Sequence, residues 1–253
     1  MWTDGEMVAT SFVQSYLSRE NFPLDINRVV LAIEKKLDIR IFIEEHYGPE
    51  EIIAQLTCSE FNALILVNSR HSMHKKRMAI AHEFGHLLLE HEFGNPDIGL
   101  SEPDRETDEA DNFAAALLVP SWNLLGLVKR YPDSFIFLVH KVSQYFGVEL
   151  EAAARRLATT DFLPGLFALL DPATSRKEWE YHSPSIHLDH EAFRHFLVHH
   201  FQNPKKREED LEIMGYPFRV ETKRIWGDKV LLTCMPFTMP TLCVRETAAG
   251  YGI

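Results

Sequence analysis

Hydrophobic and polar residues alternate along the first 120 residues with two different periods, which predicts a small unit of mixed helices and strands. Apolar residues recur at helical spacing over residues 6–17, 26–36 and 106–118, and from Ser69 or Ser72 to about Glu90. Shorter apolar runs over residues 37–43, 52–58 and 62–68 predict three strands. The last run is apolar on both faces, which predicts a strand that is well covered. We therefore expect a small sheet flanked by helices.

The pattern changes near residues 120 and 160. Residues 122–160 are mostly helical in pattern, with breaks near Pro132 and Gly147. From residue 162 onward, strand-like runs at 166–170, 230–234 and 242–244 flank an amphipathic helical stretch at 189–201. These changes predict an α+β core over residues 1–120, a helical segment over residues 121–160 and a C-terminal α/β region over residues 161–253.

Composition narrows the class of protein. Hydrophobic residues make up 45% of the 253 and charged residues 25%, as in an ordinary globular chain. The 26 basic and 37 acidic residues give a net charge of −11, which disfavours broad contact with a nucleic-acid backbone. No apolar stretch approaches the roughly 20 residues of a membrane span, and no basic segment precedes an apolar run at the N-terminus. With only three cysteines (Cys58, Cys234 and Cys243), the chain is expected to work in a reducing compartment, the cytoplasm, away from membranes.

The strongest chemical signal lies in the helix that is predicted to end near residue 90. The segment His82-Glu83-Phe84-Gly85-His86 places two histidines four residues apart, so that both imidazoles face the same side of a helix. Two neutral imidazoles suit Zn²⁺, which then needs a third ligand and keeps a fourth position for water. Glu83 is expected to take a proton from that water rather than bind the ion. Gly85, which has no side chain, is expected to leave room above the ion.

The third zinc ligand is expected from the next predicted helix, whose first turns are acidic. Nineteen residues lie between His86 and Glu106, a separation that zinc peptidases with a Glu ligand use. A second carboxylate often orients a metal-binding imidazole, and Asp111 lies at a suitable place for that part. The acidic candidates, of which at least two are expected to be merely solvated, are Glu106, Asp108, Glu109 and Asp111.

Three segments together resemble the ImmA/IrrE metallopeptidases: Asn62–Ser69, Arg77–His86 and Glu109–Pro120. The resemblance covers about residues 25–160. It implies a zincin-like metallopeptidase core over residues 1–120, built from a small sheet and the HExxH helix, in which His82 and His86 bind zinc and Glu83 is the general base. It also implies a protein substrate, a helix-turn-helix repressor whose loss switches on stress or mobile-element genes.

One position departs from the pattern of that family. The family's ligand Glu usually sits four residues before the Asn or Asp that matches Asp111, and this chain has Thr107 there. A threonine does not replace a carboxylate. Glu106 is next to that position near a helix start, and we expect it to be the third ligand, with Glu109 as the alternate. A weakened or missing metal site stays a further possibility.

Two weaker patterns lie outside the predicted core. Residues 135–157 resemble a helix-turn-helix in which Lys141, Arg155 and Arg156 would contact phosphate, although the acidic net charge disfavours DNA contact. The alternative is a plain helical hairpin that packs on the catalytic core. Residues 205–210, a mixed run of charges, are expected to form a solvated loop.

The sequence as a whole predicts a zinc-dependent endopeptidase that hydrolyses a peptide bond in a protein, with Zn²⁺ as its cofactor. The alternative is a non-catalytic regulator that retains the peptidase fold and binds a protein partner or DNA. Bound zinc would favour the enzyme, and its absence would favour the regulator.

Overall fold

A computed structural model of the chain describes residues 3–17, 21–90, 104–131, 134–160, 162, 164–171, 176–184, 208–213, 216–225 and 229–236. The chain divides into two compact units, Met1–Asn123 with Val142–Glu149, and Leu124–Lys141 with Leu150–Ile253. Each unit therefore takes part of the helical segment, and the predicted boundaries near residues 120 and 160 stay a prediction. No helix within these described ranges is long and apolar enough to cross a membrane.

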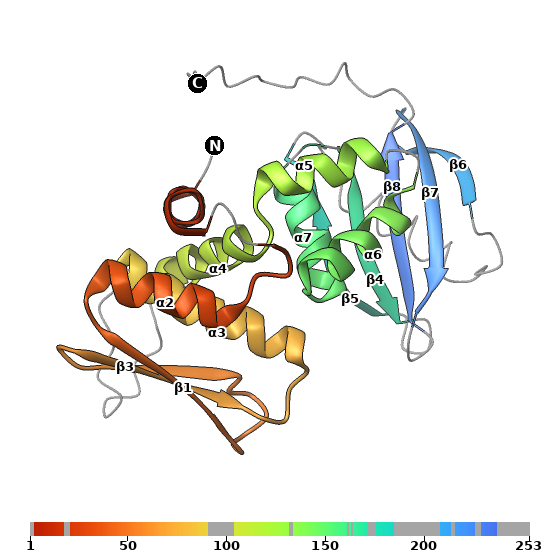
Figure 1. Cartoon of the computed structure of the whole chain (residues 1–253). Coiled ribbons are helices and arrows are strands. Elements are labelled where there is room, and N and C mark those ends of the chain that lie inside the picture. Colours follow the sequence, from red (N-terminus) through yellow and green to blue (C-terminus); the bar gives the residue numbers. More distant parts are fainter. Residues whose placement is uncertain are drawn as a thin grey trace, which may run out of the picture. The chain divides into compact units, whose positions relative to one another are not determined.

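The first unit combines a three-stranded sheet with helices (Figure 1). The helix α2 contacts β1, and α3 contacts β2 and β3. The strand β1 begins three residues later than predicted, because Asp38, with a left-handed φ of 55°, ends α2. The elements are α1 (Asp4–Phe12), the π-helical turn η1 (Val13–Leu17), α2 (Ile26–Leu37), β1 (Arg40–His46), β2 (Ala54–Cys58), β3 (Asn62–Asn68), α3 (Met73–Leu89) and α4 (Asp104–Leu118).

The sheet of this unit is covered mainly on one face. Its strand order is β1–β3–β2, with β1 parallel and β2 antiparallel to β3. In β3, Ala63, Ile65 and Val67 are buried, whereas Leu64 and Leu66, which point to the other face, are half-buried. The prediction of a well-covered strand therefore holds fully for the helix-covered face and only in part for the other face. Among the described strands, β2 pairs only with β3 and so forms an edge of the sheet.

The ends of α3 follow local rules of capping. The Oγ of Ser72 accepts a hydrogen bond from the backbone N–H of Lys75 at 3.1 Å, so Ser72 rather than Ser69 starts the helix. Glu90, with a left-handed φ of 57°, ends it. The apolar side chains that anchor α3 in the core are Ile80, Phe84, Leu87 and Leu88.

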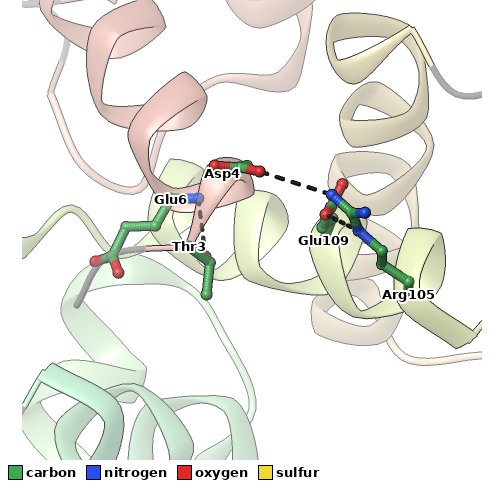
Figure 2. A network of polar contacts seen from close by, with 5 residues as sticks. All are labelled: Thr3, Asp4, Glu6, Arg105 and Glu109. Atoms are coloured by element: carbon green, nitrogen blue, oxygen red, sulfur yellow. Dashed lines mark hydrogen bonds and ion pairs between the residues drawn. The ribbon is translucent and has the colours of Figure 1, made fainter.

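The N-terminal helix α1 lies directly against α4, which Figure 2 shows from close by. The hydroxyl of Thr3 caps α1 by accepting a hydrogen bond from the backbone N–H of Glu6 at 3.2 Å. At Gly5, a Cβ atom would lie only 2.1 Å from the backbone oxygen of Glu109. Glycine is therefore required here, because the two helix backbones approach too closely for any side chain.

The helical segment predicted over residues 121–160 is confirmed as three helices, α5 (Ser121–Arg130), α6 (Phe135–Phe146) and α7 (Leu150–Thr160). The break at Gly147 is confirmed by its φ of 64°. Pro132 lies outside the described residues, between α5 and α6.

The helix α7 packs against the sheet of the second unit. This packing tests whether Arg156 on α7 contacts DNA phosphate, as the helix-turn-helix hypothesis predicts. The helix contacts β4 and β5, and its Glu151 accepts a hydrogen bond from the hydroxyl of Tyr181 at 2.8 Å. Arg156 is only 4% exposed. A buried guanidinium does not reach a DNA phosphate, so the prediction that Arg156 contacts phosphate is wrong. The alternative, a helical hairpin that packs on the catalytic core, does not describe α7 either, because α7 contacts the sheet of the second unit.

The second unit is built on a five-stranded antiparallel sheet with the order β5–β4–β8–β7–β6. The strands predicted at 166–170 and 230–234 are confirmed as the central, buried strands β4 and β8. The strands β5, β6 and β7 were not predicted. Of the loop predicted at residues 205–210, Glu208–Asp210 belong to β6, and residues 205–207 lie outside the described residues. The predicted helix at 189–201 and strand at 242–244 lie outside the described residues. The strands are β4 (Leu166–Asp171), β5 (Arg176–His182), β6 (Glu208–Ile213), β7 (Tyr216–Arg224) and β8 (Val230–Pro236).

Candidate metal centre

The helix α3 brings two imidazole nitrogens to one point. The Nε2 atoms of His82 and His86 lie 3.0 Å apart, with the two rings inclined at 75°. Two nitrogens that each bind one tetrahedral ion at 2.0–2.1 Å are about 3.3 Å apart. The pair therefore needs a change of only a few tenths of an ångström to bind a single metal ion, and His86 is almost fully buried at 3% exposure.

The other ring nitrogen of His82 faces α4. Its Nδ1 atom lies 2.8 Å from Oδ1 of Asp111. An ionised carboxylate only accepts hydrogen bonds, so the N–H group at Nδ1 of His82 donates this hydrogen bond to Asp111. This tautomer leaves a lone pair on His82 Nε2, the nitrogen that faces His86, and a metal ion requires such a lone pair.

Glu83 is buried beside the edge strand of the sheet. Only 8% of the residue is exposed. Burial raises the pKa of the Cys58 thiol on β2, and the negative charge of Glu83 raises that pKa further. The helix α3, which carries Glu83, contacts β2. In β2, Cys58 pairs with Ala63, whose side chain is buried under the helices, and therefore points to the helix-covered face. Sequence reasoning did not connect Cys58 with the site, because only the alternation along β2 indicates its direction.

Gly85 has a different part from the predicted one. A Cβ atom at Gly85 would lie 2.9 Å from the Cα of Ala110 and 3.1 Å from its backbone oxygen. The absence of a side chain at Gly85 therefore permits close packing of α3 on α4. The prediction that Gly85 leaves room above an ion is not supported, because the space beside it is filled by Ala110. By allowing the two helices to approach, Gly85 brings Asp111 within reach of His82.

The two predicted third ligands do not join the histidine pair in this structure. Within the described part of the chain, no group of three or more His, Cys, Asp or Glu side chains is arranged to hold a metal ion. Glu109 accepts a hydrogen bond from Arg105 at 2.8 Å, and Arg105 lies 3.9 Å from Asp4 of α1 (Figure 2). The carboxylate of Glu109 is thus directed to a surface cluster at α1. The assignment of Glu106, with Glu109 as alternate, stays a prediction.

Comparisons with known proteins agree with the resemblance seen in the sequence. The profile of a peptidase family described as the IrrE N-terminal-like domain matches residues 34–158. Among solved structures, a Mycobacterium tuberculosis transcriptional regulator is similar, with a TM-score of 0.64 and 16% sequence identity over 98% of this chain and 81% of that chain. At this identity the likeness shows the fold alone. No curated protein matches the chain in sequence.

Proposed function

Residues 34–158 of the chain belong to the IrrE N-terminal-like family of peptidases, and from this membership we propose that the protein is a zinc-dependent endopeptidase acting on another protein. The observation that carries the proposal is the convergence of the His82 and His86 Nε2 atoms, 3.0 Å apart, on a helix that also holds the buried Glu83. Paired imidazoles with a neighbouring carboxylate are the side chains that metal-assisted hydrolysis of a peptide bond requires.

In this proposal, His82 and His86 hold the metal ion. Bound Zn²⁺ would polarise the carbonyl of the peptide bond and lower the pKa of an attacking water. Asp111 holds the proton on Nδ1 of His82 and so leaves the Nε2 lone pair available to bind an ion. Two imidazoles, one of them fixed in the correct tautomer, fit zinc as a ligand set, although they do not complete it.

Glu83 performs the proton transfers. Its carboxylate accepts the proton of the attacking water as the new carbon–oxygen bond forms. It then gives that proton to the nitrogen of the leaving amine when the carbon–nitrogen bond breaks. Because α3, which carries the buried Glu83, contacts the edge strand β2, the transfer would take place beside the edge of the sheet.

The edge strand β2 offers a place for an extended peptide. A peptide can add to a sheet edge through its backbone, and a segment beside β2 would lie along the strand that contacts α3, the helix of Glu83. By resemblance to the family, the substrate is a helix-turn-helix repressor whose cleavage in the cytoplasm derepresses stress or mobile-element genes. A regulatory role is in keeping with the similar fold of a transcriptional regulator.

The proposal can be tested by chemical labelling of new protein N-termini. The zinc-loaded full chain and its Glu83→Gln variant are each incubated with a lysate of the source cells, and labelled N-termini are identified by mass spectrometry. We expect new termini in a helix-turn-helix protein with the parent chain and not with the variant. Identical termini in both samples would contradict the peptidase assignment and favour a regulator that only binds its partner.

A further inference from the structure

The packing of α3 on α4 fixes which residues of the two helices face one another. His82 contacts Asp111, and Gly85 lies against Ala110. The later residue of α3 lies against the earlier residue of α4, and an antiparallel packing of the two helices accounts for both contacts. One helical turn from His82 to His86 on α3 therefore corresponds to one turn back from Asp111 on α4.

One turn back from Asp111 is Thr107. Residues four apart lie on the same face of a helix, so Thr107 occupies the side of α4 that faces the histidine pair. Thr107 is half-buried there. Glu106 and Glu109 are rotated from Asp111 by about 140° and about 160° around the helix axis, and Glu109 is bonded to Arg105.

We propose that Thr107 stands at the place of a third metal ligand, and that the site holds its ion through His82 and His86 alone. The inference rests on the proposed function, because it concerns the same metal site. Catalytic zinc sites normally have three protein ligands, and a neutral hydroxyl is a far weaker ligand than a carboxylate. The ion is therefore loosely held and exchanges with the surrounding pool, so that the free zinc concentration decides whether the protein is loaded.

Replacing Thr107 tests this inference directly. Zinc affinity is measured by competition with a chromophoric chelator for the parent chain, Thr107→Glu and the matched control Thr107→Gln, which has the same size without the charge. Removing a group that merely orients a ligand costs 10–100-fold in affinity, so adding a missing ligand should tighten zinc binding by about 100-fold or more. Thr107→Gln should stay within about threefold of the parent chain.

A second variant, Thr107→His, guards against a failure of Thr107→Glu to fold, which circular dichroism would reveal. It offers an imidazole at the same position and should also tighten binding. Tight binding by the parent chain, unchanged by Thr107→Glu or Thr107→His, would overturn the inference. Loss of that binding in Glu106→Ala or Glu109→Ala would then identify the third ligand.

A further control separates this inference from the proposed function. Zinc binding by the parent chain, and the tight binding of Thr107→Glu, must both disappear when His82 and His86 are replaced by alanine. If the double replacement leaves zinc affinity unchanged in both backgrounds, the histidine pair does not bind zinc and the proposed function itself fails. If only the gain by Thr107→Glu and Thr107→His is missing, the histidine site stands and the placement of Thr107 is wrong.

Discussion

The helices α3 and α4 contribute to the candidate site in different ways. On α3, His82, Glu83 and His86 lie within five consecutive residues, and the regular geometry of a helix fixes their relative positions. On α4, Asp111 reaches His82 at 2.8 Å only because the two helices pack closely at Gly85. A motif within one helix therefore carries its own geometry, whereas a ligand from a second helix depends on packing.

The largest expected effect concerns α3. Glu83→Gln removes the proposed base and should lower the rate of substrate cleavage by roughly 10²–10⁴-fold. Zinc affinity should hardly change, because Glu83 is not proposed as a ligand. Cleavage is followed by gel electrophoresis of the substrate that the labelling experiment identifies. Normal cleavage by the variant would refute the proposed mechanism.

The contribution of α4 is sharpened by Asp111→Ala. Loss of the acceptor for His82 Nδ1 should lower zinc affinity by about 10–100-fold, because the ring is no longer held in the binding tautomer. The control is Asp108→Ala, an exposed aspartate on the same helix, which should leave the affinity unchanged. Equal affinities in the two variants would show that Asp111 does not orient His82.

The packing that joins the two helices can be altered at Gly85. A methyl group there meets the backbone of Ala110, so Gly85→Ala should lower the free energy of unfolding by about 1–3 kcal/mol. Gly126→Ala in α5 is the control: nothing lies within 4 Å of its added Cβ. This control should raise stability by up to about 1 kcal/mol, because alanine favours helices. Urea denaturation measures both, and equal effects would contradict the close contact.

The smallest expected effect concerns Cys58. Its thiol pKa is raised by burial and by Glu83, so less of the reactive thiolate is present at a given pH, and alkylation by iodoacetamide should reach half its maximal rate at a higher pH than for a free cysteine. Glu83→Gln removes a negative charge and should shift that midpoint to lower pH. The rates are measured by peptide mass spectrometry, and an unchanged midpoint would place Glu83 away from Cys58.

The difference between the two helices also explains what the sequence predicts well. The start of α3, predicted at Ser69 or Ser72 and found at Ser72, and the spacing of the histidine pair depend on local geometry and hydrogen bonds, which neighbouring residues determine. The third ligand could not be assigned in the same way, because which of Glu106, Thr107 and Glu109 faces the histidine pair depends on how α4 packs against α3. The role of Gly85 was predicted wrongly for the same reason, because its contact with Ala110 exists only once α4 packs against α3.

The second unit shows where hydrophobic patterning fails. The central strands β4 and β8 are continuous apolar runs and are recognised easily. In contrast, β6 (Glu208–Ile213) is largely acidic and β7 (Tyr216–Arg224) contains Pro217 and charged residues, so neither has the apolar run that marks a strand. The strand β7 pairs with both β6 and β8, and the sequence of a single segment does not contain this pairing.

X-ray absorption at the zinc edge tests the central claim, that His82 and His86 together hold a zinc ion, most directly. On the zinc-loaded protein we predict scattering from two imidazoles with nitrogen atoms about 2.0–2.1 Å from the metal. That signal should weaken in His82→Ala and in His86→Ala, and should vanish when both are replaced. A zinc spectrum without imidazole scattering, or one that neither replacement alters, would contradict the account.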